Sequence, residues 1–144
     1  MARRRRKAAV VRTSEGEEAR IAFDPVRHAR PALTGFFRFM ELWGADTAQT
    51  MAILGRPSQR TFYRWKAGDV AGLPHDVVRR IGYVSGIWKA LQIVYSNPQQ
   101  ADTWVRTPNR FFGGQTPLDR MSAGDVTDLA AVRQYIDAAR SPWS

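Results

Sequence analysis

Hydrophobic residues recur at three- and four-residue spacing along most of the chain, which is the pattern of a helix with one buried face. The stretch "RPALTGFFRFMELWGA" shows it first, with Pro31 where a first helical turn tolerates proline and Gly44 where a helix can stop. Its apolar face is formed by Leu33, Phe36, Phe37, Met40 and Trp43. No stretch alternates between apolar and polar residues regularly enough to predict a strand.

Further helical segments follow from the same spacing and from residues that can cap them. Their predicted starts are Asp46 or Thr47, Ser58, about Pro74, Pro98, Pro117 and about Gly124. The segment from about Pro74 to Ser96 is the longest, and its apolar surface is wider than a single stripe. We therefore expect that helix to pack on two sides. Together these patterns predict an all-α fold.

A sharp bend is predicted at "FFGGQTPLD", residues 111–119. Gly113 and Gly114 permit backbone angles that a side chain would forbid, so the chain can turn there. Thr116 can cap a short helix whose first residue is Pro117. On the residues alone, a C-terminal bundle that merely completes the core accounts for this unit.

The positive charge is confined to the first two-thirds of the chain. Of the net charge of +9, residues 1–20 carry +4, residues 21–98 carry +5, and residues 99–144 are neutral. A positive field attracts polyanions, and nucleic acid is the commonest polyanion that a basic protein meets. Residues 1–98 therefore suit binding to a phosphate backbone, and residues 99–144 do not.

Residues 1–20 contain charge blocks and little apolar periodicity. This composition is typical of a disordered tail, and also of a basic arm that reaches DNA phosphates or a minor groove; the two readings are compatible. The apolar stretch in "MARRRRKAAVV" is too short for a secretory signal, and no apolar run approaches the ~20 residues of a membrane span. Cysteine is absent, which fits a cytoplasmic location.

The residues that enzymes use for catalysis are scarce. Without cysteine, thiolate zinc sites and cysteine nucleophiles are excluded. His28 and His75 lie far apart in the sequence, and Gly113-Gly114 lacks the further residues of a phosphate-binding loop. We expect a protein that is not an enzyme, with no catalytic residue, no cofactor and no metal site.

Two short predicted helices separated by a tight turn indicate a helix-turn-helix. In this motif the first helix holds the second at a steep angle, so that the second can enter the major groove of DNA. Phe62 and Trp65 share one face of the second helix and would hold it to the core, while residues 56–66 carry four positive charges and no acid. The alternative is an ordinary helical pair with a solvated basic face.

Outward-facing side chains of the second helix suit DNA, because Arg and Gln can bond two base-edge atoms at once and the flanking residues are placed for phosphate oxygens. The candidates for base contacts are Gln59, Arg60, Tyr63 and Arg64, and those for phosphate contacts are Arg56, Ser58 and Lys66.

The segment "SQRTFYRWKAGD" resembles the recognition helix of lambdoid phage repressors and of the Xre family. Those helices open with a small capping residue and Gln, carry an apolar pair three residues apart, and end in Gly. The resemblance implies that Gln59, Arg60 and Arg64 occupy base-reading positions. The stretch between Gly55 and Ser58 is one residue longer than in those repressors.

The C-terminal stretch is similar to the toxin-binding domain of the Xre/MbcA/ParS antitoxin family. The similarity covers about residues 99–144 and rests on Trp104, Pro108-Asn109, "FGG-TPLD-M", Gly124 and "VRQYIDAAR" followed by a Trp. Membership implies a type II antitoxin whose partner is a RES-domain toxin that consumes NAD⁺ or ADP-ribosylates a target. It also implies dimerisation through the helical core and repression of the operon that encodes the pair.

The resemblance further implies that the bend lets the last helix fold back and present its end over the NAD⁺ pocket of the toxin. We expect Arg133, Arg140 and the terminal "SPWS" on one exposed edge. Arg140 or the carboxylate of Ser144 would pair with charged pocket groups while Trp143 fills an apolar recess, since aromatic and Arg side chains concentrate binding energy at interfaces. A frayed end is the alternative reading of "SPWS".

The predicted organisation has three parts: a basic, flexible arm at residues 1–20, an Xre-like helix-turn-helix with dimerisation helices at 21–97, and a toxin-binding domain at 98–144, joined by the long helix. The expected partners are a RES-domain toxin, operator DNA and a second copy of the chain, with a higher toxin–antitoxin assembly and no membrane. The alternative function is a stand-alone phage-type (Xre) transcriptional repressor without a toxin partner.

Overall fold

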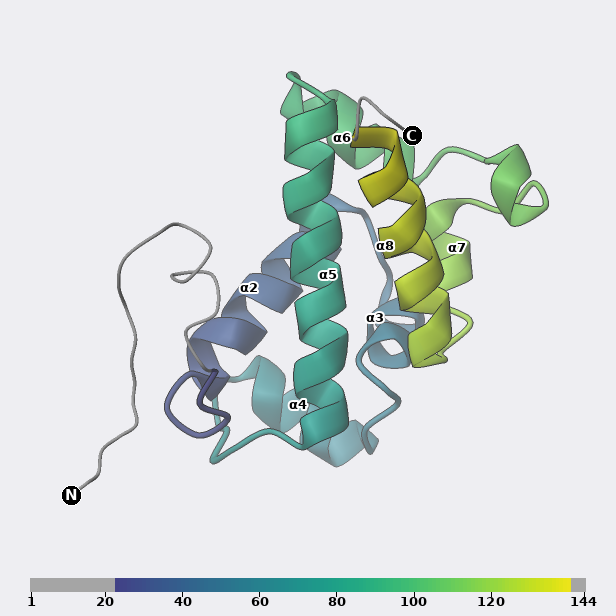
Figure 1. Ribbon diagram of the computed structural model, residues 1–144. Helices are drawn as coiled ribbons and strands as arrows, with labels where there is room; N and C mark the ends of the chain where they lie inside the picture. Colours follow the sequence, from purple (N-terminus) through teal and green to yellow (C-terminus); the bar gives the residue numbers. More distant parts are fainter. Residues whose placement is uncertain (1–22, 141–144) are drawn as a thin grey trace, which may run out of the picture.

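The computed structural model describes residues 23–140, and within that range every regular element is helical, which confirms the all-α prediction (Figure 1). The elements are α2 (Ala29–Leu42), α3 (Thr47–Ile53), α4 (Gln59–Lys66), α5 (His75–Val94), α6 (Pro98–Val105), the short 3-10 helix η2 (Arg110–Phe112), α7 (Pro117–Met121) and α8 (Val126–Arg140). Residues 1–20, Trp143 and Ser144, for which the sequence predicts contacts, lie outside the described residues.

Side-chain caps fix where the short helices begin. Asp46, rather than Thr47, caps α3 in a capping box with Gln49. Ser58 accepts a hydrogen bond from the Thr61 amide at the start of α4, and Thr116 caps α7 directly before Pro117. Each cap gives a partner to an amide that the first helical turn leaves unpaired, so local sequence sets these boundaries.

Helix α5 lies at the centre of the fold, with α2 packed on one side and α8 along the other (Figure 1). Its buried residues include Ile81, Val84 and Ile87, and they belong to one hydrophobic cluster that also contains Phe36 of α2 and Val132 of α8. The wide apolar surface predicted for this helix is therefore used on two sides, as expected. The core is continuous across residue 98, where the sequence predicts a domain boundary.

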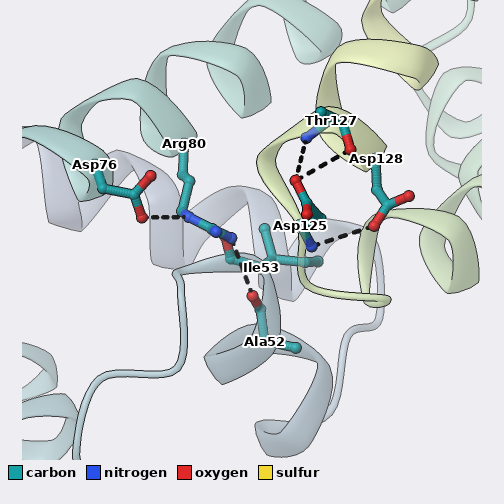
Figure 2. Close-up of polar contacts among 7 residues, drawn as sticks. All are labelled: Ala52, Ile53, Asp76, Arg80, Asp125, Thr127 and Asp128. Carbon is teal, nitrogen blue, oxygen red and sulfur yellow. Dashed lines mark hydrogen bonds and ion pairs between the residues drawn. The ribbon is translucent and has the colours of Figure 1, made fainter.

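Arg80 of α5 is buried and bonds to the end of another helix (Figure 2). Its Nε donates to Oδ2 of Asp76 at 2.7 Å, and its Nη1 donates to the carbonyls of Ala52 and Ile53 at 3.4 Å each. These carbonyls belong to the last turn of α3, where intrahelical partners are lacking, and the Ala52 carbonyl also accepts a hydrogen bond from the Gly55 amide. Arg80 thereby ties the start of α5 to the end of α3.

Two other arginines bond to carbonyls where helices end. Arg106, just after α6, donates to the carbonyl of Leu42 at the end of α2 at 3.2 Å. Arg30 of α2 donates to the carbonyl of Gly68, just after α4, at 2.9 Å. Cations are favoured at helix C-termini because the carbonyl end of the helix dipole is negative. Hydrophobic periodicity along the sequence cannot predict long-range contacts of this kind.

We predict that Arg80→Ala lowers the free energy of unfolding by about 1–3 kcal/mol, because the buried carbonyls of α3 lose a hydrogen-bond partner. Arg79→Ala is the matched control, since Arg79 is exposed and precedes Arg80 on the same helix; its effect should stay within about 0.5 kcal/mol. Urea unfolding followed by circular dichroism measures both. Equal losses in the two variants would contradict the role given to Arg80.

Candidate functional site

Helix α4 presents one polar face to solvent and buries the other. Phe62 and Trp65 are 0% and 6% exposed, so they anchor the helix as predicted. Four side chains that the sequence predicts for base contacts lie together on the exposed face, lining one shallow surface: Gln59, Arg60, Tyr63 and Arg64. Tyr63 is 49% exposed although it is a large aromatic residue. The face is therefore accessible, with two guanidinium groups and one amide.

Arg64 and Lys66 differ in their surroundings. Arg64 Nε lies 3.6 Å from Oδ2 of Asp69, and both side chains are largely exposed, so solvent screens the pair. Lys66 instead lies over the ring of Phe62, with Nζ 6.0 Å from the ring centroid. It borders a different hollow, between α2 and α4, from the one lined by Arg64. The structure thus separates Lys66 from the other predicted DNA contacts.

The turn between α3 and α4 uses two successive residues with left-handed backbone angles. Gly55 has φ 102° and Arg56 has φ 55°, and Arg56 is the one non-glycine residue with positive φ among residues 23–140. A Cβ built on Gly55 would lie 3.0 Å from Nε of the buried Arg80, so both backbone angle and space favour glycine there.

The side chain of Arg56 points toward the C-terminal part of the fold. Its guanidinium lies directly over Gly124, in the loop between α7 and α8, where any Cβ would overlap it. Of the residues predicted for phosphate contact, Ser58 caps α4, and the Arg56 side chain reaches from the α3–α4 turn to the α7–α8 loop. The structure therefore places Arg56 between the two predicted functional parts of the chain.

The start of α8 is built around two aspartates (Figure 2). Asp125 Oδ1 accepts hydrogen bonds from the amide and the hydroxyl of Thr127, and the amide bond, together with the hydroxyl bond, lowers the pKa of Asp125. Asp128 accepts from Nε of Arg120 at 2.9 Å and also from the Asp125 amide. These bonds fix the angle at which α8 leaves the α7–α8 loop.

The predicted bend forms a small loop closed by its own backbone. The Asn109 amide donates to the Gln115 carbonyl, and the Gly114 amide donates to the Asn109 carbonyl. Gly113 and Gly114 have φ 68° and 88°, which confirms the prediction that they supply unusual backbone angles. The loop places Phe112 in the core, 4% exposed, and leaves Phe111 67% exposed.

The bend also assembles an aromatic cluster that the sequence reasoning missed. The ring of Tyr135 on α8 lies 4.8 Å from Phe111, 5.4 Å from Phe112 and 5.9 Å from Trp104, measured between centroids. Trp104 and Tyr135 both appear in the motifs quoted for the family resemblance. Their mutual contact depends on the path of the bend, which no periodicity reveals.

Arg133 and Arg140 share one carboxylate on α8. Arg133 Nε donates to Asp137 at 2.9 Å, and Arg140 Nη1 lies 3.9 Å from the other oxygen of Asp137. Arg133 is half-buried against Gly86 of α5, where a Cβ would overlap its guanidinium, whereas Arg140 is exposed at the end of the helix. Both arginines therefore lie near the Asp137 carboxylate, but Arg133 is half-buried whereas Arg140 is exposed.

Residues 90–141 match the family described as the antitoxin Xre/MbcA/ParS C-terminal toxin-binding domain. The chain is also similar to "Uncharacterized protein y4oB" of Sinorhizobium fredii (strain NBRC 101917 / NGR234), with 40% identity over 127 residues, 81% of this chain and 97% of that protein. No solved structure matches. The chain therefore belongs to the same family as the rhizobial protein, and its residues 90–141 form a toxin-binding domain of the antitoxin type.

Two kinds of feature are not found in the part of the chain that the structure describes. No helix between residues 23 and 140 is both long and apolar enough to cross a membrane. The same residues contain no cluster of three or more His, Asp or Glu side chains arranged to hold a metal ion.

Gly55→Ala should lower the free energy of unfolding by at least about 2 kcal/mol, because left-handed backbone strain is added to a close contact with the buried Arg80 side chain. Gly113→Ala is the matched control: it also has positive φ, but nothing lies within 4 Å of an added Cβ. That variant should lose only about 1 kcal/mol. Thermal or urea unfolding compares them; if the control loses as much, the clash with Arg80 is not the cause.

Proposed function

We propose that this chain is the antitoxin of a type II toxin–antitoxin system, that it neutralises a RES-domain toxin by covering the active site, and that it represses its own operon through the α3–α4 helix-turn-helix. The observation that carries the proposal is the match of residues 90–141 to a toxin-binding antitoxin domain. Helix α4, with its exposed Gln and Arg side chains, supports the second activity.

Neutralisation is proposed to be steric and electrostatic. A toxin that consumes NAD⁺ or ADP-ribosylates a target needs an open pocket for the anionic dinucleotide, and a peptide end can occupy such a pocket. Arg140 is exposed at the end of α8, directly before "SPWS". In this proposal Arg140 pairs with pocket charges and Trp143 fills an apolar recess. Arg133, which is half-buried against α5, would set the direction of the helix end.

Repression is proposed to use α4 in the major groove, with Gln59, Arg60 and Arg64 reading base edges and Ser58 and Lys66 near the backbone. The N-terminal arm adds seven Arg and Lys residues, which would strengthen binding through phosphate neutralisation. A homodimer would set two copies of α4 about one DNA turn apart, ~34 Å. Because residues 99–144 carry no net charge, the positive field belongs to the part of the chain that is proposed to face DNA.

The alternative is a stand-alone Xre-type repressor without a toxin partner. The exposed basic face of α4 fits that function equally well. The toxin-binding domain at residues 90–141 favours the antitoxin, because a lone repressor has no use for it. Inspection of the neighbouring genes for a RES-type protein separates the two functions directly.

We predict that co-expression of the full chain with the RES-domain toxin of its own operon restores growth, and that a chain ending at Ala139 does not, because it lacks the residues that would enter the pocket. Removal of residues 1–20 is the control and should leave rescue intact. Colony counts and intracellular NAD⁺ provide the measurement. Rescue by the shortened chain would refute the active-site placement, and no rescue by the full chain would refute the RES assignment.

For DNA, Arg60→Ala should weaken operator binding by about 1–3 kcal/mol, roughly 5- to 150-fold, because a base-reading guanidinium is lost. Arg110→Ala removes the same charge from η2, in the neutral segment, and should change affinity little. Gel-shift titration with the upstream region of the operon, at two salt concentrations, measures both. Equal effects of the two substitutions would mean that α4 acts only through net charge.

A further inference from the structure

The hydrophobic core does not use the side chain of Phe111, which is exposed to solvent. Its side chain is 67% exposed, whereas the adjacent Phe112 is 4% exposed and already fills the core position under the bend. The Asn109 side chain accepts a hydrogen bond from the Phe111 amide at 2.8 Å, within the closed loop of residues 109–115. The ring is therefore presented to solvent by a hydrogen-bonded loop and by its contact with Tyr135.

A groove of about 560 Å³ runs beside this ring. Its floor is the outer side of α8, where Ala131, Ala138 and Ala139 leave room, and its walls include Phe111 and Tyr135. Small residues opposite an aromatic wall form a recess for an apolar side chain. Anchors of this kind, seated in pockets near the centre of an interface, carry much of the binding energy.

The groove offers no uncompensated positive charge. Arg120 borders it, but its Nε is paired with Asp128 at 2.9 Å and its guanidinium lies 5.8 Å from the centroid of the Phe112 ring. The remaining lining residues are apolar or, in Gln134, neutral. A neutral, mostly apolar surface of this kind suits an apolar protein side chain and disfavours nucleic acid, whose affinity comes largely from phosphate contacts.

The position of the groove bears on which partner could occupy it. All of its lining residues lie within residues 90–141, the segment that matches the toxin-binding domain. It extends along α8 to Ala139, next to Arg140, from which the proposed plug of the toxin active site continues. A toxin that receives the end of α8 in its pocket must bring the rim of that pocket against this part of the helix.

We propose that the groove between Phe111 and α8 is a second anchoring point for the toxin, and that it receives an apolar side chain from the rim of the toxin's active-site pocket. This inference rests on the proposed function, because the toxin is its occupant. Contact with the toxin at this groove would explain why the bend holds the Phe111 ring toward solvent. The held ring loses little conformational freedom on binding, which raises affinity.

The test measures the affinity of the full chain for the catalytically inactivated toxin of its own operon by calorimetry. Phe111→Ser removes the wall of the groove, and Ala138→Arg fills it from an exposed helical position. Each should weaken binding at least about tenfold. Val26→Ser is the matched control, because Val26 is 68% exposed and lies outside the toxin-binding domain; its affinity should equal that of the original chain. Thermal melting within a few degrees establishes that each variant is folded.

The outcomes separate this inference from the proposed function. Unchanged affinity in Phe111→Ser and Ala138→Arg, with strong binding by the original chain, overturns the groove and leaves the function standing. Failure of the original chain to bind the toxin refutes both. If sedimentation shows that the two groove variants lose self-association and keep toxin affinity, the groove receives a second copy of the chain and the inference is wrong.

Discussion

The burial of both sides of α5 is the constraint on which the rest of the structure depends. A helix that is apolar on two faces must be covered twice, and here α2 covers one side and α8 the other. This arrangement places the α3–α4 region and the segment that matches the toxin-binding domain on one hydrophobic core. The two regions are consequently neighbours along a single helix, with α3 contacting α7 near one end of it.

Arginine side chains complete this packing where separate elements meet. Arg80 bonds to the end of α3, and Arg56 and Arg133 lie over glycines of other elements. The glycines matter because they allow a guanidinium to approach the backbone closely. Hence several of the cations that make the chain basic act within the fold, whereas Arg60 and Arg64 of α4 remain exposed.

The bend at residues 111–119 contributes to the core and also leaves the Phe111 ring exposed on the surface. Gly113 and Gly114 close the loop, Thr116 restarts the helix, and Phe112 enters the core. The same geometry turns Phe111 outward beside Tyr135. A segment without catalytic groups can therefore be specific in shape, because its role is to position α8 and the aromatic surface next to it.

The sequence by itself determined the helical class, the caps at Ser58 and Thr116, the glycines of the bend and the outward face of α4, because these follow from local spacing and local hydrogen bonds. Only the tertiary structure decided that Arg80 is buried, that Arg56 lies over Gly124 and that Phe111 rather than Phe112 is exposed. Each of these depends on a close approach between segments far apart in the sequence. Helical periodicity describes which face of a helix is apolar, but it cannot specify which neighbour covers that face.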